Sequence, residues 1–311
     1  MQEVFSLTFG KVGMLLIFIA TGYFMRRHHD LPDDAGQVLS LLCTLLFSPA
    51  YYISKMSSEF TLEVLDKNIL LIGYGVIFVL VSIGFALVLS KPFSRNRIER
   101  NSLIYAFSIP NYGYFGYPVI EAVFGQAVLA EVMIFLIPLS LATSSFGYSL
   151  FVGGKKIPWK KIFMAPLPIS LVIGMVLGLS GIQLPSFVKS AVVTAGNCMS
   201  PCSMLLAGFM MGKFPLKSLL TGWRPYAYSA IRLIGIPLIF AALLLGCGLE
   251  GKYLLLPLLV AGIPLGLNLV VYPESQGQEQ QASDNAKLCF ISYLLAVIVL
   301  PFTFALLSNI L

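Results

Sequence analysis

Long apolar segments dominate this sequence and restrict what the chain can fold into. An α-helix needs about 20 apolar residues to cross the hydrocarbon core of a bilayer. Charged residues make up only 11% of the chain, whereas a soluble domain usually carries about 25%. We therefore expect an all-α integral membrane protein with ten transmembrane helices. The segments are 6–26, 35–54, 68–90, 101–123, 127–152, 162–181, 186–212, 225–247, 252–274 and 286–308.

Basic residues gather in alternate loops, which predicts how the chain is oriented. The loops at 26–27, 91–100, 155–161 and 213–224 hold most of the lysines and arginines between the segments. Loops rich in lysine and arginine remain on the cytoplasmic side of a membrane. We therefore expect the N-terminus and the C-terminus to lie outside. The first segment has no small-residue cleavage site at its end, so we expect it to stay as an anchor.

Several classes of function do not fit the sequence. The net charge of +6 does not indicate a nucleic-acid partner, because the basic residues form short clusters between apolar segments. Cys198 and Cys202 share a helical face, but no histidine or carboxylate lies near them in sequence, so we expect no metal and no cofactor. His28 and His29 lie in a loop, and no catalytic constellation falls within an apolar segment, so we do not expect an enzyme.

Three short motifs recur in the same order in the two halves of the chain. Five helices in each half is an odd number, so the halves must lie in opposite orientations. We expect one repeat at 1–153 and an inverted repeat at 162–311, joined by a short basic linker at 154–161. The motif pairs are "FSP" at 47–49 and "MSP" at 199–201, "IP" at 109–110 and at 263–264, and "IPLSLATSS" from 137 and "LPFTFALLS" from 300.

The fourth segment carries residues that are poorly suited to a transmembrane helix. Within "SIPNYGYFGYP" at 108–118, Pro110 removes a backbone donor, and Gly113 and Gly116 permit unwound conformations. Unpaired backbone groups are costly in hydrocarbon, so irregular backbone survives there only where it lines a cavity or is buried in protein. We therefore predict a functional helix break. For a single segment, a simple proline kink satisfied by neighbouring helices is the alternative.

The ninth segment has matching features in "GIPLGLNLVVYP" at 262–273, which contains Pro264 and Asn268. Interrupted segments at corresponding places in two inverted halves indicate a transporter binding site near the bilayer midplane. Half-helix N-termini present partial positive charge to an anion, and an asparagine can bond a substrate or freed backbone. We expect Asn111 and Asn268 to lie close to each other's broken segment.

Four stretches resemble motifs of the auxin efflux carrier family, in the family's order and over essentially the whole chain. "SIPNYGYFGYPVIEAVFG" is similar to the fourth-helix signature and "SPCSMLLAGFMMGK" to the seventh-helix pattern, while "IRLIGIPLI" and "GIPLGLN" resemble motifs of the eighth and ninth helices. The resemblance implies two inverted five-helix repeats with broken, crossing helices 4 and 9, as in bile-acid symporters and sodium–proton antiporters. It also implies secondary transport of organic anions, such as dicarboxylates in bacteria and indole-acetate in plants.

From these features we expect a secondary transporter that moves a small organic anion, a mono- or dicarboxylate, by alternating access. The short link between the fifth and sixth segments favours a compact bacterial-type member, located in the inner membrane among its lipids. A sodium-coupled carrier like the bile-acid and organic-anion symporters is an alternative, and a channel is another. The candidate coupling ions are H⁺ and Na⁺, and a homodimer is kept as a candidate assembly.

Polar residues within the segments complete the candidate site, and some have a second explanation. Arg232 either meets the anion or extends its stem to the membrane interface. Asn197 and Ser200 either line the site or pack between helices. Glu121 either gates the site or lies at a solvated helix end. The predicted substrate-binding residues are Asn111, Tyr112, Gly113, Asn268, Gly266, Arg232, Ser200 and Asn197, and the predicted helix-break residues are Pro110, Gly116, Pro118, Pro264 and Pro273.

Overall fold

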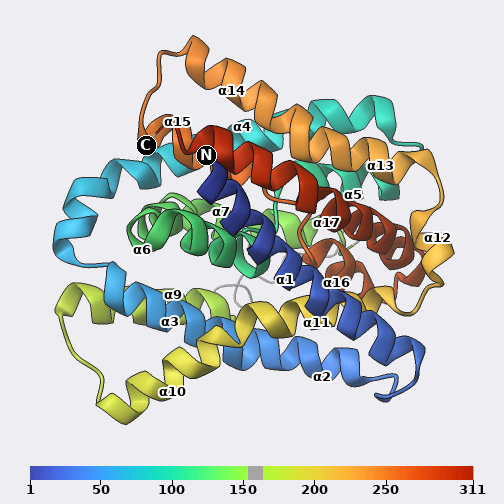
Figure 1. Ribbon diagram of the computed structural model, residues 1–311, viewed down its shortest axis with the longest axis horizontal. Coiled ribbons are helices and arrows are strands. Elements are labelled where there is room, and N and C mark those ends of the chain that lie inside the picture. The colour runs from blue at the N-terminus through green and yellow to red at the C-terminus, as the bar shows by residue number, and fades with distance from the viewer. Residues whose placement is uncertain (153–163, 311) are drawn as a thin grey trace.

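The computed structural model describes residues 1–152 and 164–310, and its regular secondary structure there is helical (Figure 1). The expected linker at 154–161 lies outside the described residues. Both chain termini lie at the same end of the molecule, where the Asn309 side-chain amide donates to the Met1 sulfur over 3.4 Å. We call this end the N-terminal end and the other the opposite end.

Seven helical stretches among the described residues are long and apolar enough to cross a membrane, which identifies an all-helical membrane protein. They are α1 (Gln2–Arg27), α2 to α3 (Ala35–Glu59), α4 (Leu62–Phe93), η2 with α6 (Tyr112–Phe135), α10 with α11 (Ser186–Met211), α13 to α14 (Trp223–Gly246) and α17 (Glu279–Leu307). Two shorter apolar helices are α9 (Pro166–Ser180) and α15 (Lys252–Ala261). The remaining helices are α5 (Arg97–Ser108), α7 (Ile137–Ala142), α12 (Leu216–Leu220) and α16 (Asn268–Ser275).

Several of these stretches contain a π-helical turn of five residues, in which an extra residue widens the helix. The turn η1 (Cys43–Phe47) joins α2 (Ala35–Leu42) to α3 (Ser48–Glu59), and η4 (Ile231–Gly235) joins α13 (Trp223–Ala230) to α14 (Ile236–Gly246). The turn η2 (Tyr112–Gly116) leads into α6 (Tyr117–Phe135), and η3 (Thr143–Gly147) follows α7. Helices α10 (Ser186–Asn197) and α11 (Met199–Met211) follow one another directly.

The expected apolar segments correspond to helical stretches in the described residues, and the fourth and ninth are interrupted by several non-helical residues. The fourth consists of α5, η2 and the first part of α6, and the ninth consists of α15 and α16. Gly125 ends the first part of α6, because its φ of 83° cannot continue a right-handed helix. Helix α5 begins at Arg97, earlier than expected, because the Asn96 side chain accepts a hydrogen bond from the Glu99 N–H (2.8 Å) and caps the helix.

The helices pack in two groups (Figure 1). The panel helices are α1, α2, α3, α9, α10 and α11, in which α1 packs along α11, and α3 packs along α9 and α10. The bundle helices are α4 to α7 and α13 to α17, in which α4 packs against α5, α6 and α7, and α17 packs against α13 and α16. Helix α1 also lies along α17 and α6, so it forms much of the contact between the groups.

Glycines bring the panel helices into backbone contact. A Cβ atom on Gly208 of α11 would lie 1.8 Å from the Ile19 carbonyl oxygen of α1, and one on Gly22 of α1 would lie 2.0 Å from the Leu205 carbonyl oxygen. In α9, a Cβ on Gly178 would lie 2.5 Å from a backbone oxygen of α3. No larger residue fits at these distances, so close van der Waals packing of small residues joins these helices.

Two ion pairs join the panel helices to the bundle helices, one near each end. Lys55 of α3 pairs with Glu121 of α6 near the N-terminal end. Lys213, which follows α11, pairs with Glu274 of α16 at the opposite end. The Lys55 and Glu121 side chains are 15% and 26% exposed, so this pair is shielded from water more than a surface ion pair is, whereas Lys213 is exposed.

We expect Gly208→Leu to destabilise the protein by about 1–3 kcal/mol or more, because the new side chain must push α1 away from α11. Gly13→Leu is the matched control on α1, since a Cβ there would meet nothing within 4 Å. Thermal unfolding of the purified proteins in detergent measures both effects. A Gly208→Leu protein that melts together with the wild type and the control would contradict the packing described here.

Candidate functional site

Two helix breaks lie against each other within the bundle helices. The first separates α5 from η2 and the second separates α15 from α16. Pro110 in the first break and Leu265 in the second form an isolated antiparallel β-bridge. Across it, the Asn111 N–H donates to the Pro264 carbonyl oxygen over 2.9 Å. The two interrupted stretches therefore cross at their breaks.

Glycines allow the two stretches to approach. A Cβ on Gly116 would lie 2.5 Å from Ile263 Cδ1, and one on Gly266 would lie 3.3 Å from the Ile109 carbonyl oxygen. The prediction of an unwound backbone at Gly113 and Gly116 is wrong, because both residues already lie in the helical turn η2. The break is shorter than expected, and Gly116 is needed for close approach and not for an irregular conformation.

The backbone groups freed by the breaks have partners. The Asn111 carbonyl oxygen accepts hydrogen bonds from the Phe115 N–H (3.3 Å) and the Gly116 N–H (2.9 Å), which starts the next helix. The Leu265 N–H donates to the Ser292 hydroxyl of α17 over 3.2 Å. These groups of the irregular backbone are therefore satisfied within the protein, as the apolar surroundings require.

A cavity of about 340 Å³ lies against the crossing, between the panel helices and the bundle helices. It extends from the breaks toward the opposite end, where Tyr148 and the residues at the start of α9 line it. The bundle helices contribute Tyr105, Pro110–Tyr114, Thr143, Ser144, Tyr148, Gly266–Asn268, Val271 and Tyr272, and the panel side contributes Thr44, Ser48, Tyr52, Ala165–Pro168 and Met199.

The lining of this cavity is polar and aromatic but carries no formal charge. Six tyrosines line it, and none of the described residues around it is a lysine, arginine, histidine, aspartate or glutamate. The Ser48 hydroxyl is buried and has no hydrogen-bond partner among the described residues, so it is available to a ligand. No described group of three histidine, cysteine, aspartate or glutamate residues could hold a metal ion.

The two predicted asparagines both line the cavity. The Asn111 amide nitrogen donates to the Tyr293 hydroxyl (3.0 Å), and the Asn268 amide nitrogen donates to the Tyr272 hydroxyl (3.3 Å). Each amide has a second N–H and a carbonyl oxygen with which to bond a ligand. Tyr112, the first residue of η2, also lines the cavity, and helix N-termini have N–H groups without a helical acceptor.

Three of the four π-helical turns among the described residues contribute to the cavity. They supply Thr44 from η1, Tyr112 from η2 and Thr143 from η3. Such turns are frequent at functional sites, because the extra residue redirects side chains. The panel-side residues Thr44 and Tyr52 are absent from the sequence prediction. The signal available for Thr44 is the spacing of Ser40, Thr44 and Ser48, which places three hydroxyl side chains on one face of the second apolar segment.

Arg232 does not line the cavity. Its side chain is only 2% exposed, so it does not extend to the membrane interface. The guanidinium donates to three backbone carbonyl oxygens, those of Phe107 (3.1 Å), Val260 (3.3 Å) and Ile263 (3.1 Å). The predicted contact with substrate and the snorkelling alternative are therefore both unsupported by its position.

The two candidates from the seventh segment lie in different surroundings. Ser200 is buried, and its hydroxyl donates to the Tyr114 carbonyl oxygen over 2.7 Å, so it touches the crossing without lining the cavity. That carbonyl is the one that Pro118 deprives of its helical donor. Pro118 therefore lies inside the η2–α6 stretch, and its assignment to the helix break is wrong. Asn197 is exposed at the end of α10.

Pro273 also lies inside a helix and not in a break. Helix α16 continues past it because the carbonyl oxygen that it leaves without a donor, that of Leu269, accepts a hydrogen bond from the Asn285 side-chain amide over 2.7 Å. Asn285 is buried in the adjacent helix α17. Pro110 and Pro264 are the predicted break residues that do lie in the breaks.

Comparison with known proteins adds one finding to this geometry. Residues 7–154 and 149–304 match the model of a family described as membrane transport protein. No curated protein matches the sequence at a significant level.

We expect Asn285→Leu to cost about 1–3 kcal/mol of stability, because it leaves the Leu269 carbonyl oxygen buried without a donor. Pro273→Ala restores an N–H four residues after Leu269, so the loss in the double variant should be much smaller. Chemical unfolding of the wild type, both single variants and the double variant measures this coupling. Additive losses would show that the Asn285 amide does not replace the missing helical bond.

Proposed function

This chain belongs to the auxin efflux carrier family of membrane transport proteins, which are transporters and not enzymes, and we propose that it carries a small organic anion by alternating access. The observation that supports this function best is the cavity at the crossing. It lies between two groups of helices, and it is lined by both helix breaks. A substrate held there touches both groups. Movement of one group relative to the other would therefore close the cavity to one side of the membrane and open it to the other.

The chemistry of the lining supports an anion as substrate. Amide and hydroxyl donors from Asn111, Asn268 and Ser48 surround a space that a carboxylate could enter. The N-termini of the η2–α6 stretch and of α16 add partial positive charge. A fixed lysine or arginine in the cavity would bind an anion more tightly, whereas neutral donors allow release, which a carrier requires. The tyrosines offer aromatic faces to the rest of a mono- or dicarboxylate.

We further propose that ten helices cross the membrane as two inverted repeats, at 1–153 and 162–311. The pairing of the panel helices supports this, because α1 packs on α11 and α3 packs on α9, so each half covers the other. The two breaks also pair antiparallel, as breaks related by inversion would. The ion pairs Lys55–Glu121 and Lys213–Glu274 take up corresponding positions at the two ends.

The distribution of basic residues supports an orientation with both termini outside a bacterial cell membrane. The opposite end then faces the cytoplasm. Because the cavity extends toward that end, the structure would correspond to a state with access from the cytoplasm.

Contacts between the groups would then close the outer side. Tyr117 of α6 stacks on Tyr51 of α3 with ring centroids 6.2 Å apart, and it meets Tyr52 edge-on at 6.1 Å. Lys55 and Glu121, one turn further along the same two helices, add an ion pair to this contact. We propose that these five side chains form the outer gate, which must open for the cavity to reach the outside.

Transport of carboxylates in proteoliposomes tests the proposed function. We expect saturable uptake of [¹⁴C]succinate or [¹⁴C]indole-3-acetate that accelerates when the unlabelled compound is present inside. Asn111→Ala should weaken binding by about 1–3 kcal/mol. Asn111→Asp should transport less than Asn111→Ala, because it adds a like charge beside the anion.

Asn101→Ala is the control for these variants, because Asn101 lies in α5 and donates to the Leu150 carbonyl oxygen (2.8 Å) without lining the cavity. Uptake without saturation or counter-stimulation would indicate a channel. If the Asn111→Asp protein transports like the wild type, the anion does not bind at the crossing.

Cross-linking tests the outer gate in a protein whose native cysteines are replaced by serine. A short bis-thiol-reactive linker between Lys55→Cys and Glu121→Cys should abolish transport, because it fixes a panel helix to a bundle helix. Reduction of a cleavable linker should restore it. The control is Lys252→Cys with Glu131→Cys, since that 3.6 Å ion pair joins two bundle helices. Full transport by the completely cross-linked 55–121 protein would contradict relative motion of the two groups.

A further inference from the structure

Arg232 is a fully buried cation in a protein of the membrane, and every hydrogen bond that it makes with the described residues goes to backbone. Its Nε and its two terminal nitrogens donate to the carbonyl oxygens of Ile263, Phe107 and Val260 at 3.1–3.3 Å. Phe107 belongs to the last turn of α5, Val260 belongs to the last turn of α15, and Ile263 lies two residues beyond the end of α15. One guanidinium therefore binds the C-terminal ends of both half-helices that lead into the crossing.

The charges at these helix ends match the charge of Arg232. A helix C-terminus carries about −0.5 elementary charge, so two such ends amount to about −1. An arginine supplies +1, and its planar group of donors can bond several carbonyl oxygens at once. An unbalanced buried charge would be strongly unfavourable, whereas this arrangement satisfies both the cation and the carbonyl groups. The negative ends of α5 and α15 are therefore neutralised.

The opposite ends at the same crossing remain positive. The N-termini of the η2–α6 stretch and of α16 begin directly after the two breaks, and their first residues, Tyr112 and Asn268, line the cavity. Without Arg232, the negative C-termini on the far side of each break would oppose the field of these N-termini. With Arg232 in place, the positive ends dominate the field in the cavity, and this favours an anion.

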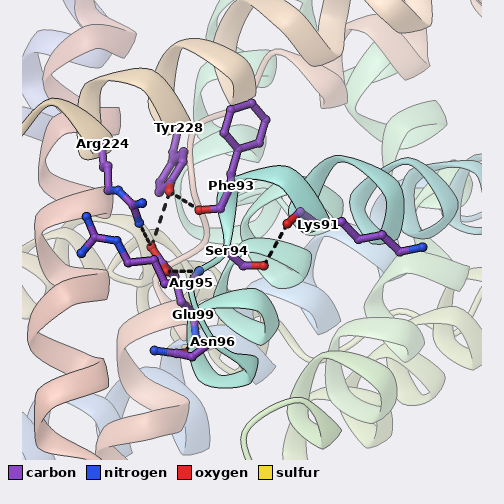
Figure 2. Close-up of polar contacts among 8 residues, drawn as sticks. All are labelled: Lys91, Phe93, Ser94, Arg95, Asn96, Glu99, Arg224 and Tyr228. Carbon is purple, nitrogen blue, oxygen red and sulfur yellow. Dashed lines mark hydrogen bonds and ion pairs between the residues drawn. The ribbon is translucent and has the colours of Figure 1, made fainter.

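Contacts further along the same helix face hold Arg232 against α5. Arg224, Tyr228 and Arg232 are spaced four residues apart on the α13–η4 stretch, so they point to one side. Arg224 Nη1 pairs with Glu99 of α5 at 2.6 Å, and the Tyr228 hydroxyl donates to the Phe93 carbonyl oxygen over 2.8 Å (Figure 2).

Glu99 itself is fixed from a further direction, because its second carboxylate oxygen accepts a hydrogen bond from the Arg95 N–H over 2.7 Å (Figure 2). The Tyr228 ring also packs edge-on against the Phe107 ring, with centroids 6.3 Å apart. These contacts fix α13 relative to α5. Arg232 therefore stays beside the Phe107 carbonyl oxygen.

From these contacts we propose that Arg232 is a positioning residue that gives the crossing its preference for anions, without touching the substrate. It joins the two C-terminal ends into one rigid unit and cancels their charge. This inference rests on the proposed transport of an organic anion through the cavity, and it assigns the origin of that selectivity to a residue outside the cavity.

Selectivity between a carboxylate and its neutral amide tests the charge effect. We compare uptake of [¹⁴C]succinate with succinamide, and of [¹⁴C]indole-3-acetate with indole-3-acetamide. Arg232→Gln should reduce the ratio of carboxylate to amide uptake by roughly tenfold or more, as expected for lost interactions with a charged group. Arg232→Lys should transport more slowly but keep most of the ratio, because it keeps the charge. A residue with only a structural role would lower uptake of both compounds alike.

Ser229→Ala is the matched control, since Ser229 is buried one turn earlier and donates to the Leu288 carbonyl oxygen of α17 (3.5 Å), away from the crossing. It should keep the wild-type ratio. An unchanged ratio in Arg232→Gln, or an equal loss in Arg232→Lys, would overturn the proposal.

Hydrogen–deuterium exchange tests the positioning role without any substrate. Arg232→Gln should accelerate amide exchange in both 107–113 and 260–268, whereas Ser229→Ala should leave both segments protected. Protection of either segment in Arg232→Gln would contradict the joint anchoring of the two breaks. If the wild type transports none of the four compounds, the proposed function fails, and the exchange measurement still decides whether Arg232 holds the crossing together.

Discussion

A proline inside a membrane helix leaves the carbonyl oxygen four residues earlier without a donor, and in hydrocarbon only another protein group can replace it. This requirement explains how the interrupted helices are held. At three prolines within helices of the described residues, the replacement donor is a side chain from a different helix. These donors are Ser200 for Tyr114 before Pro118, Asn285 for Leu269 before Pro273, and the Tyr74 hydroxyl for Tyr253 before Pro257 (2.6 Å). Arg232 adds a donor to the Val260 carbonyl oxygen, four residues before Pro264 in the second break. Each proline thus specifies a contact between helices.

In the proposed transport cycle, these contacts distinguish helices that stay together from helices that move relative to each other. Arg232, Asn285 and Tyr74 donate within the bundle helices, so they make that group rigid around the crossing. The Ser200 hydroxyl is the exception among the four, because it reaches from a panel helix to the Tyr114 carbonyl oxygen. Together with the two lysine–glutamate ion pairs, this hydrogen bond is one of the polar contacts between the panel helices and the bundle helices. In the proposed transport cycle, the apolar remainder of that contact slides at lower cost.

The sequence predicts the helices and the location of the two breaks well, because the apolar length of a segment and the chemistry of proline act locally. The family expected from the motifs is confirmed by the match over most of the chain. The extent of the breaks is not predicted, since Pro118 and Pro273 are accommodated by Ser200 and Asn285, which are distant in sequence. The position of Arg232 is missed for the same reason: only the fold shows which carbonyl oxygens lie near its guanidinium.

The glycine contacts of the panel helices have a consequence for how the chain assembles as it is made. Gly22 of α1 packs against the backbone of α11, and Gly178 of α9 packs against the backbone of α3. The helices made first therefore have no partner for these faces until the second half of the chain has entered the membrane. Contacts of such long sequence separation form slowly. Until then α1 and α3 are held in lipid with these contact faces uncovered, so the panel is completed only when synthesis has passed α11.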